Sequence, residues 1–134
     1  MRKITNYILI SLFIFFSAEV IASELNDKRG IFSNMKYFEE AGDLVGQELF
    51  IFPGCGDYCV LFQIAEGGFP YAELLPLEVN GNKIGFALSN NNNRYERVTF
   101  SGQVMKDKIE GTLNFDGVEN KVTYSRGKSY WQFE

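Results

Sequence analysis

Several segments in the second half of the chain alternate apolar and polar residues and are separated by turn sequences. The segments 84–88, 98–104 and 109–115 place an apolar residue or glycine at every second position. This period of two predicts β-strands with one face toward a core. Asn-Gly at 80–81 and Asp-Gly at 116–117 separate such segments, and these dipeptides favour two-residue β-hairpins. We therefore expect consecutive antiparallel strands.

Other parts of the chain add further strands to this meander. They are expected around residues 48–52, 58–65, 74–79, 121–124 and 129–133. About seven or eight strands in so short a chain favour an all-β fold that closes into a small barrel or a strongly curved sandwich, because closure removes exposed sheet edges. The segment 33–42 fits either one short N-terminal helix, capped by Ser33 and ended by Gly42, or an extended chain.

The expected hairpin turns predict which residues face each other. A two-residue turn at 81–82 would place three apolar pairs on one face of the ladder. These pairs are Val79 with Ile84, Leu77 with Phe86, and Leu75 with Leu88. A turn at 106–107 would place Val104 opposite Ile109.

The turn at 106–107 would also place Gly102 directly opposite Gly111, with both facing inward. Two opposed glycines permit three interpretations: sharp coiling of a closing sheet, close approach of an aromatic ring, or internal space for a ligand. Tyr124 and Trp131 are the rings that we consider for the second interpretation. Only the third interpretation implies a function.

The N-terminus has the features of a signal peptide. Arg2 and Lys3 precede the apolar run 7–16, and Ala22 ends a stretch that a signal peptidase accepts. The apolar run is shorter than the roughly 20 residues of a spanning helix and is followed by Glu19. We therefore expect cleavage after Ala22, export to the periplasm or the medium, and no stable membrane anchor.

Residues 23–134 are expected to form a single β domain with an acidic balance. Removal of residues 1–22 takes away two basic residues and one acidic residue, which changes the formal charge of the chain from −4 to −5. Nucleic acids and anionic membrane surfaces attract basic proteins. The charge therefore argues against both as partners and suits a basic protein partner.

Two cysteines, Cys55 and Cys59, lie close together in the string PGCGDYC. In an exported protein such a pair predicts a disulfide. The spacing does not match a redox-active CxxC motif. The chain has no histidine, so that serine–histidine and cysteine–histidine pairs and the common zinc sites are excluded. We expect no metal, no cofactor and no enzymatic activity.

Two short segments are candidate interaction surfaces. Asp57 and Tyr58 would present an acidic and aromatic tip beside the disulfide, although the tip could serve only to join two strands. Phe69 and Tyr71 follow two glycines in an expected loop. Exposed loop aromatics favour binding, whereas the same residues folded back would close the barrel end.

These features favour two functions. The first is an exported, non-catalytic protein that binds another protein, such as an inhibitor or an immunity-type partner of an envelope protein. The second is a lipocalin-like carrier of a small apolar ligand, held in the space beside Gly102 and Gly111. The acidic balance and the stapled tip support the first, and the barrel with its opposed glycines supports the second.

Overall fold

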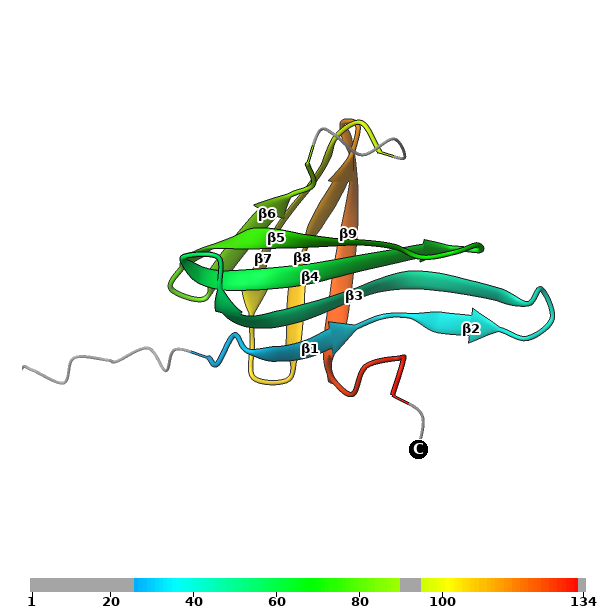
Figure 1. Ribbon diagram of the computed structural model, residues 1–134, viewed down its shortest axis with the longest axis horizontal. Helices are drawn as coiled ribbons and strands as arrows, with labels where there is room; N and C mark the ends of the chain where they lie inside the picture. The colour runs from blue at the N-terminus through cyan, green and yellow to red at the C-terminus, as the bar shows by residue number, and fades with distance from the viewer. Residues whose placement is uncertain (1–25, 90–94, 133–134) are drawn as a thin grey trace, which may run out of the picture.

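The computed structural model describes residues 26–89 and 95–132, which form nine antiparallel β-strands and no helix (Figure 1). The strands are β1 (Gly30–Ser33), β2 (Lys36–Phe38), β3 (Asp43–Gly54), β4 (Asp57–Glu66), β5 (Tyr71–Asn80), β6 (Lys83–Ala87), β7 (Val98–Val104), β8 (Lys108–Phe115) and β9 (Val118–Gly127). The expectation of a small antiparallel meander is confirmed.

Eight of the strands form a closed barrel. Each strand from β3 to β8 pairs with the next one along the chain, and β1 lies between β9 and β3. The contact of β1 with β9 is short, with three residue pairs. Strand β2 pairs only with β3 in the described part of the chain. The long strands β3, β4 and β5 cross β7, β8 and β9 steeply, and the β2–β3 hairpin projects to one side (Figure 1).

The barrel has two ends, which we name by their connections. The tip end carries the β3–β4, β5–β6 and β7–β8 turns, and the loop end carries the β4–β5, β6–β7 and β8–β9 connections. The chain before β1 lies at the tip end, where Asn26 donates a hydrogen bond to the Val104 carbonyl. Features at the two ends are therefore separated by the length of the barrel.

Alternate residues of the strands fill the barrel interior. A row of aromatic rings runs through it, in which Phe86 lies 5.1 Å from Phe62 and 5.2 Å from Phe100, and Phe100 lies 5.8 Å from Tyr124, between ring centroids. All four rings are buried. Aromatic residues bury the largest apolar area per residue, and a small barrel needs that area for its stability.

The β5–β6 and β7–β8 ladders have the predicted registers next to their turns. Val79 pairs with Ile84, and Val104 pairs with Ile109. The β5–β6 ladder extends to the pair of Glu78 and Gly85 and not further. The remaining members of the expected apolar face are nevertheless all buried in the core: Leu75, Leu77, Phe86 and Leu88.

The two opposed glycines, Gly102 and Gly111, pair as expected. The ring of Phe100 lies against both of them: a Cβ atom added at Gly102 would lie 2.5 Å from this ring, and one added at Gly111 would lie 2.7 Å from it. Close approach of an aromatic ring therefore explains the pair. The ring is that of Phe100, not Tyr124 or Trp131, and it occupies the space beside the glycines.

The segment 33–42 contains no helix, which corrects that alternative. Strand β1 ends at Ser33 and β2 follows after two residues. Asn34 holds this interruption on β3, because its backbone N–H donates to the Gln47 carbonyl and its side-chain Oδ1 accepts from the Gln47 N–H. The polar side chain thus competes with helix formation by bonding to a neighbouring strand.

The strand expected at 129–133 is also wrong, because the described residues after β9 form a turn. The buried carboxylate of Glu48 accepts hydrogen bonds from the Ser129 hydroxyl and, at 2.8 Å, from the Tyr130 N–H. These bonds fold the chain back onto the outside of β3. The aromatic residues in this segment suggested a strand, but a buried acceptor on another strand determines its conformation.

One arginine holds the chain before β1. The Arg126 guanidinium donates to the carbonyls of Asp27, Arg29 and Lys106 and lies 4.4 Å from the centroid of the Phe32 ring. It thereby joins the beginning of the described chain to the β7–β8 turn.

The expected signal peptide, residues 1–22, lies outside the described residues. Within those residues, no helix has the length and apolar character needed to cross a membrane.

Candidate interaction face

An apolar row crosses the outside of four neighbouring strands. Ile31 of β1 pairs with Phe50 of β3, Phe50 pairs with Leu61 of β4, and Leu61 pairs with Leu74 of β5. The residues on either side of these in sequence, such as Leu49 and Leu75, are buried in the core. Because side chains alternate along a strand, the row points away from the barrel. Phe50 is 40% exposed and Leu74 is 56% exposed.

A second row extends this surface toward the tip end. Phe52 pairs with Cys59, and Cys59 pairs with Pro76. The rings of Phe50 and Phe52 lie 4.9 Å apart. We call the two rows together the outer apolar face, which comprises Ile31, Phe50, Phe52, Leu61, Leu74 and Pro76.

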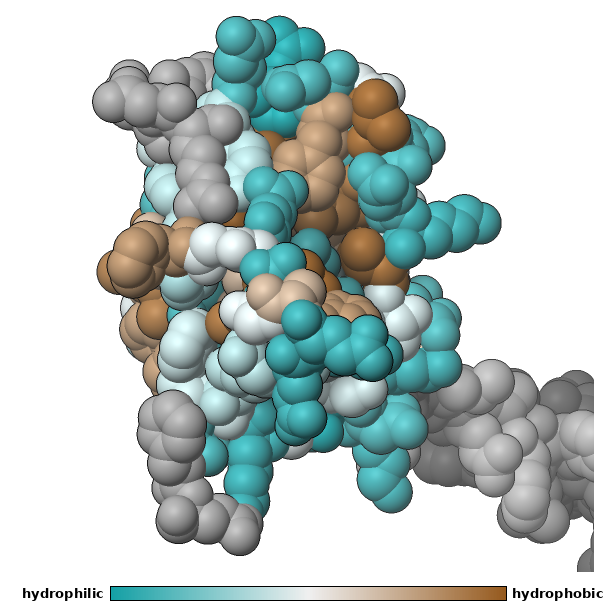
Figure 2. Space-filling view, turned by 90° about the vertical axis from the view of Figure 1, so that its right-hand side faces the viewer, coloured by the Kyte–Doolittle hydropathy of each residue, from teal (hydrophilic) through white to brown (hydrophobic). Residues whose placement is uncertain are grey.

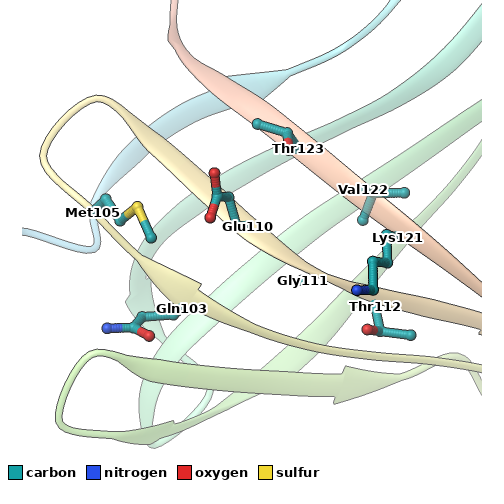
Figure 3. Close-up of a pocket in the computed structure, with 8 residues that line it drawn as sticks. All are labelled: Gln103, Met105, Glu110, Gly111, Thr112, Lys121, Val122 and Thr123. Carbon is teal, nitrogen blue, oxygen red and sulfur yellow. The ribbon is translucent and has the colours of Figure 1, made fainter.

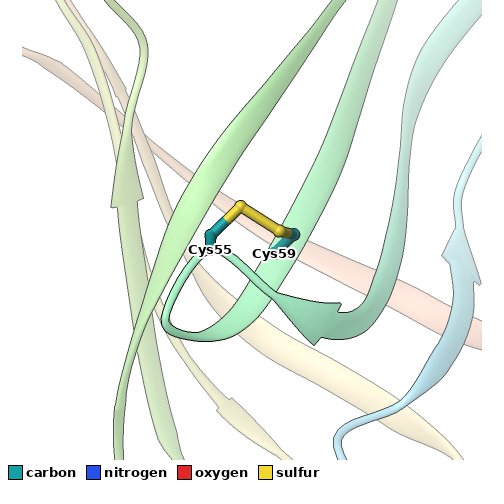
Figure 4. The surroundings of a disulfide bond; sticks show 2 residues. All are labelled: Cys55 and Cys59. Carbon is teal, nitrogen blue, oxygen red and sulfur yellow. A yellow bond between two sulfur atoms is a disulfide. The ribbon is translucent and has the colours of Figure 1, made fainter.

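The disulfide fixes the tip of the β3–β4 hairpin beside the outer apolar face (Figure 4). It joins Cys55 in the turn to Cys59 in β4, with 5.3 Å between the two Cα atoms. The bond passes over Gly54, where an added Cβ would lie 2.7 Å from the Cys59 Sγ atom. The bond therefore holds the β3–β4 turn against the strand that carries Leu61.

The border of the face carries acidic groups at the tip end. Asp57 of β4 and Glu78 of β5 are both exposed. They are the next residues toward the tip end after the paired Tyr58 and Leu77. Among the outward residues of β1, β3, β4 and β5 there is no lysine or arginine. The face is therefore apolar at its centre and acidic at this border.

The C-terminal turn borders the face on the opposite side. It covers the row that contains Glu48 and Gln63, which is next to the row of Phe50. The Trp131 Nε1–H donates to the Gln63 Oε1 at 2.9 Å, and the Trp131 ring remains 38% exposed. Tryptophan is a frequent anchor in protein interfaces, so this ring extends the aromatic surface.

The outside of β7, β8 and β9 is different in character. The outward residues there are polar or charged, and they border a shallow groove of about 370 Å³ (Figure 3). The residues lining it include Gln103, Glu110, Thr112, Lys121 and Thr123. A polar outer surface is the normal state of an antiparallel sheet that faces water. The contrast makes the outer apolar face the exceptional part of the barrel exterior.

The predicted tip residues have different orientations. Asp57 is exposed beside the disulfide. Tyr58 points into the barrel and packs against the core. The tip therefore contributes an acidic group to the surface, whereas its aromatic side chain is structural.

The predicted loop residues lie at the other end of the barrel. Phe69 is 93% exposed. Tyr71 packs against the core and donates a hydrogen bond to Glu73, and its ring lies 5.6 Å from that of Tyr95. The structure thus separates Phe69 and Tyr71 from the disulfide tip, and the four predicted surface residues do not form one site.

Two ionisable groups at the loop end have shifted pKa values. Burial, supported by the hydrogen bond to Glu73, raises the pKa of Tyr71 to about 12. Burial alone would raise the pKa of Glu73, but hydrogen bonds from Ser89 and Tyr71 outweigh this effect and lower it. The carboxylate is therefore a stable acceptor that holds the Tyr71 ring in place.

The sequence contains a signal for the outer apolar face that alternation of apolar and polar residues does not reveal. Residues 49–52 and 60–62 are continuous apolar runs, and Leu74 and Leu75 are adjacent. A continuous run predicts a strand that is apolar on both faces. In β3, β4 and β5 one of these faces fills the core, and the other forms the exterior surface.

Hydrophobic side chains also reach the surface elsewhere. On the side toward which the β2–β3 hairpin projects, they lie in separate patches between hydrophilic ones (Figure 2). Tyr37 and Phe38 of β2 are about half exposed. These residues extend the hairpin surface and are distinct from the cross-strand rows of the outer apolar face.

The fold and this face define a small, disulfide-stapled antiparallel barrel with an apolar exterior on one half. Comparison with protein families, with curated proteins and with solved structures gives no match. Within the described residues, no group of three or more cysteine, aspartate or glutamate residues could hold a metal ion.

Proposed function

We propose that this protein is an exported, non-catalytic binding protein that docks another protein on the outer apolar face. We propose an inhibitor or an immunity-type partner of an envelope protein as the particular kind of binding protein. The disulfide is compatible with an oxidising compartment. The absence of histidine from the chain also favours binding over acid–base catalysis.

The observation that carries this proposal is the cross-strand row of Ile31, Phe50, Leu61 and Leu74 on the barrel exterior. Apolar groups exposed side by side on a rigid sheet lose unfavourable contact with water when a partner covers them. The sheet holds the side chains in place before binding, so that little conformational entropy is lost. Phe50 and Trp131 are the aromatic anchors of this surface.

The charge of the face specifies the partner further. Asp57 and Glu78 are exposed at the border, and no cation points outward from these strands. A partner with an apolar centre and basic residues around it would complement the face. Opposite charges at an interface border mainly accelerate association and select the partner.

The described residues give no support to the lipocalin-like carrier. The space that motivated it lay beside Gly102 and Gly111, and the Phe100 ring lies against both glycines. The grooves bordered by these strands are shallow and open on the polar exterior. The exterior of the barrel therefore supports the protein-binding function.

A capture experiment with surface variants tests the proposal. The processed protein is immobilised and exposed to the envelope fraction of its own cells, beside the double variant Phe50→Ser/Leu74→Ser. Loss of two anchor side chains from an interface centre should weaken binding at least about tenfold. We expect one stoichiometric partner that the wild type retains and the double variant loses.

The control is Phe69→Ser, which removes the more exposed loop aromatic and should leave capture unchanged. Circular dichroism and a denaturant titration establish that all variants fold. A partner retained by the double variant and lost by the Phe69 variant would assign binding to the loop end. A wild-type protein that retains no partner would contradict the proposal altogether.

A further inference from the structure

One edge of the barrel sheet has no neighbouring strand. Strand β9 pairs with β8 along its whole length, but it pairs with β1 only from Ser125 to Gly127. In the described part of the chain no strand adjoins the other side of β9 between Val118 and Tyr124. Strand β2, which continues β1, instead follows β3 away from β9 (Figure 1).

The hydrogen-bonding groups on this edge can be assigned from the β8–β9 hairpin. Its two-residue turn, Asp116-Gly117, has positive φ values of 51° and 93°, so Phe115 and Val118 form the hydrogen-bonded pair that closes it. Such pairs alternate along an antiparallel ladder. The N–H and C=O groups of Glu119, Lys121 and Thr123 therefore point to the open edge.

The sequence of this edge, Val118-Glu119-Asn120-Lys121-Val122, complements itself in the antiparallel direction. A second copy that places Glu119 opposite Lys121 would do so twice, once on each side of a two-fold axis through Asn120. Val118 would then face Val122 of the other copy. Opposite charges and apolar residues directly across a ladder are both stabilising pairs. We infer that a second copy of this chain pairs here through β9.

Neighbouring registers lack this complementarity. A shift of two residues is the smallest one that keeps the edge N–H and C=O groups opposed. A shift toward the β8–β9 turn places Glu119 opposite Glu119 of the second copy. A shift in the opposite direction places Lys121 opposite Lys121 of the second copy. Like charges directly across a ladder are destabilising. The charges therefore select a single register and permit a symmetric, closed dimer.

The exposure of the edge fits a second copy. Val118 is 64% exposed, although by register it points to the same side of the sheet as the buried Tyr124. The free part of β9 runs from the β8–β9 turn to the first residue paired with β1, and two copies in the inferred register would pair along residues 118–122 of it. This contact is independent of the outer apolar face, which lies on β1, β3, β4 and β5.

Charge reversal tests the inference on the processed protein by sedimentation equilibrium at low salt, up to about 1 mM. A contact of one strand from each copy is small, so a dissociation constant of roughly 10 μM to 1 mM is expected. Glu119→Lys and Lys121→Glu each convert both symmetric pairs to like charges. Each single variant should dimerise at least about tenfold more weakly.

Mixing the two single variants provides the decisive result. At positions 119 and 121 one variant then carries two lysines and the other carries two glutamates. Both charged pairs between the strands of the heterodimer are therefore opposite in charge again. We expect a heterodimer on mixing, and restored dimerisation in the double variant Glu119→Lys/Lys121→Glu. Lys83→Glu, an exposed charge reversal on β6, serves as the matched control and should leave the wild-type dissociation constant unchanged.

Three outcomes would overturn the inference. The wild type remains monomeric to about 1 mM, the single variants dimerise as strongly as the wild type, or the mixture of the two forms no heterodimer. A dimer that Phe50→Ser/Leu74→Ser abolishes and the charge reversals do not would place self-association on the outer apolar face instead.

Discussion

Gly102 and Gly111 show how one ring determines the shape of a barrel wall. The Phe100 ring lies so close to both positions that neither has room for a Cβ atom. Phe100 and Gly102 lie on β7, and Gly111 lies on the adjacent strand β8. Glycines in such positions permit the sharp coiling that closes a short sheet. The pairing of the two glycines could be predicted from the turn at 106–107. The identity of the ring could not, because local sequence does not specify which inward side chain leans over its neighbours.

Substitution of Gly111 by alanine should destabilise the protein strongly. The added Cβ would lie 2.4 Å from the Ser101 carbonyl oxygen as well as against the Phe100 ring, and the backbone atom cannot move without distorting the ladder. Overpacking of this kind costs about 1–3 kcal/mol in free energy of unfolding. Denaturant titration at equilibrium measures the change.

Gly127→Ala is the control for this substitution. An added Cβ at Gly127 meets nothing within 4 Å, so its free energy of unfolding should stay within about 0.5 kcal/mol of the wild type. Equal stability of the Gly111 and Gly127 variants would show that the Phe100 ring can move aside at no cost. The close approach would then not be a constraint on the fold.

At the scale of single elements, the strands differ in how much of them could be predicted. Strands β6, β7 and β8 have a polar outer face, so hydrophobicity alternates and both type and register follow from the sequence. In β3, β4 and β5 the outer face is apolar as well, and alternation is lost over residues 49–52. The sequence still predicts strands there, but alternation does not predict the second apolar face, which is the candidate site.

The C-terminal turn depends on a contact between distant residues that local sequence could not specify. Glu48 is 1% exposed, and its carboxylate accepts bonds from Ser129 and Tyr130, which lie 81 and 82 residues further along the chain. A buried charge needs such partners, because removal of a carboxylate from water is costly. Burial of Glu48 and the position of the turn are therefore mutually dependent.

Substitution of Glu48 by alanine should release this turn. Ser129 and the Tyr130 N–H would lose their acceptor, and we expect a loss of about 1–3 kcal/mol in free energy of unfolding. Trp131 is the single tryptophan of the chain, so its fluorescence reports the turn directly. The emission should shift to longer wavelength as the ring becomes more exposed.

Glu110→Ala is the matched control, because the Glu110 carboxylate forms an ion pair with Lys108 on the polar exterior. Surface ion pairs contribute about 0–1 kcal/mol, and the tryptophan emission should not change. An unshifted emission in the Glu48 variant would mean that the hydrogen bond between Trp131 and Gln63 holds the turn without the carboxylate.

The whole molecule has an apolar interior, and its exterior is apolar on one half of the barrel and polar on the other. The acidic border, the apolar rows and the free edge of β9 all lie on the outside of the barrel, where sequence patterns do not specify which residues become neighbours. Fold class follows from local periodicity and turn chemistry. Surfaces for partners depend on which strands become neighbours, and this adjacency is a property of the closed sheet.

The stability of the whole barrel should fall in alkaline solution. Burial raises the pKa of Tyr71 to about 12 and also raises the pKa of Tyr124, whereas tyrosine in an unfolded chain titrates near pH 10. Below about pH 10 both states keep these protons, and the stabilisation is complete. As the pH rises from about 10 toward 12, the unfolded state loses its protons first, so the free energy of unfolding decreases.

Substitution of Tyr71 and Tyr124 by phenylalanine should make the free energy of unfolding decrease less steeply with pH. Each removed group lowers the slope by up to about 1.4 kcal/mol per pH unit, which denaturant titrations between pH 9 and 12 would measure. Tyr37→Phe is the control, because this ring is 53% exposed on the projecting hairpin, and its slope should match the wild type. A slope that persists in Tyr71→Phe/Tyr124→Phe would assign alkaline unfolding to other groups, and these two hydroxyls would then not couple proton loss to opening of the barrel.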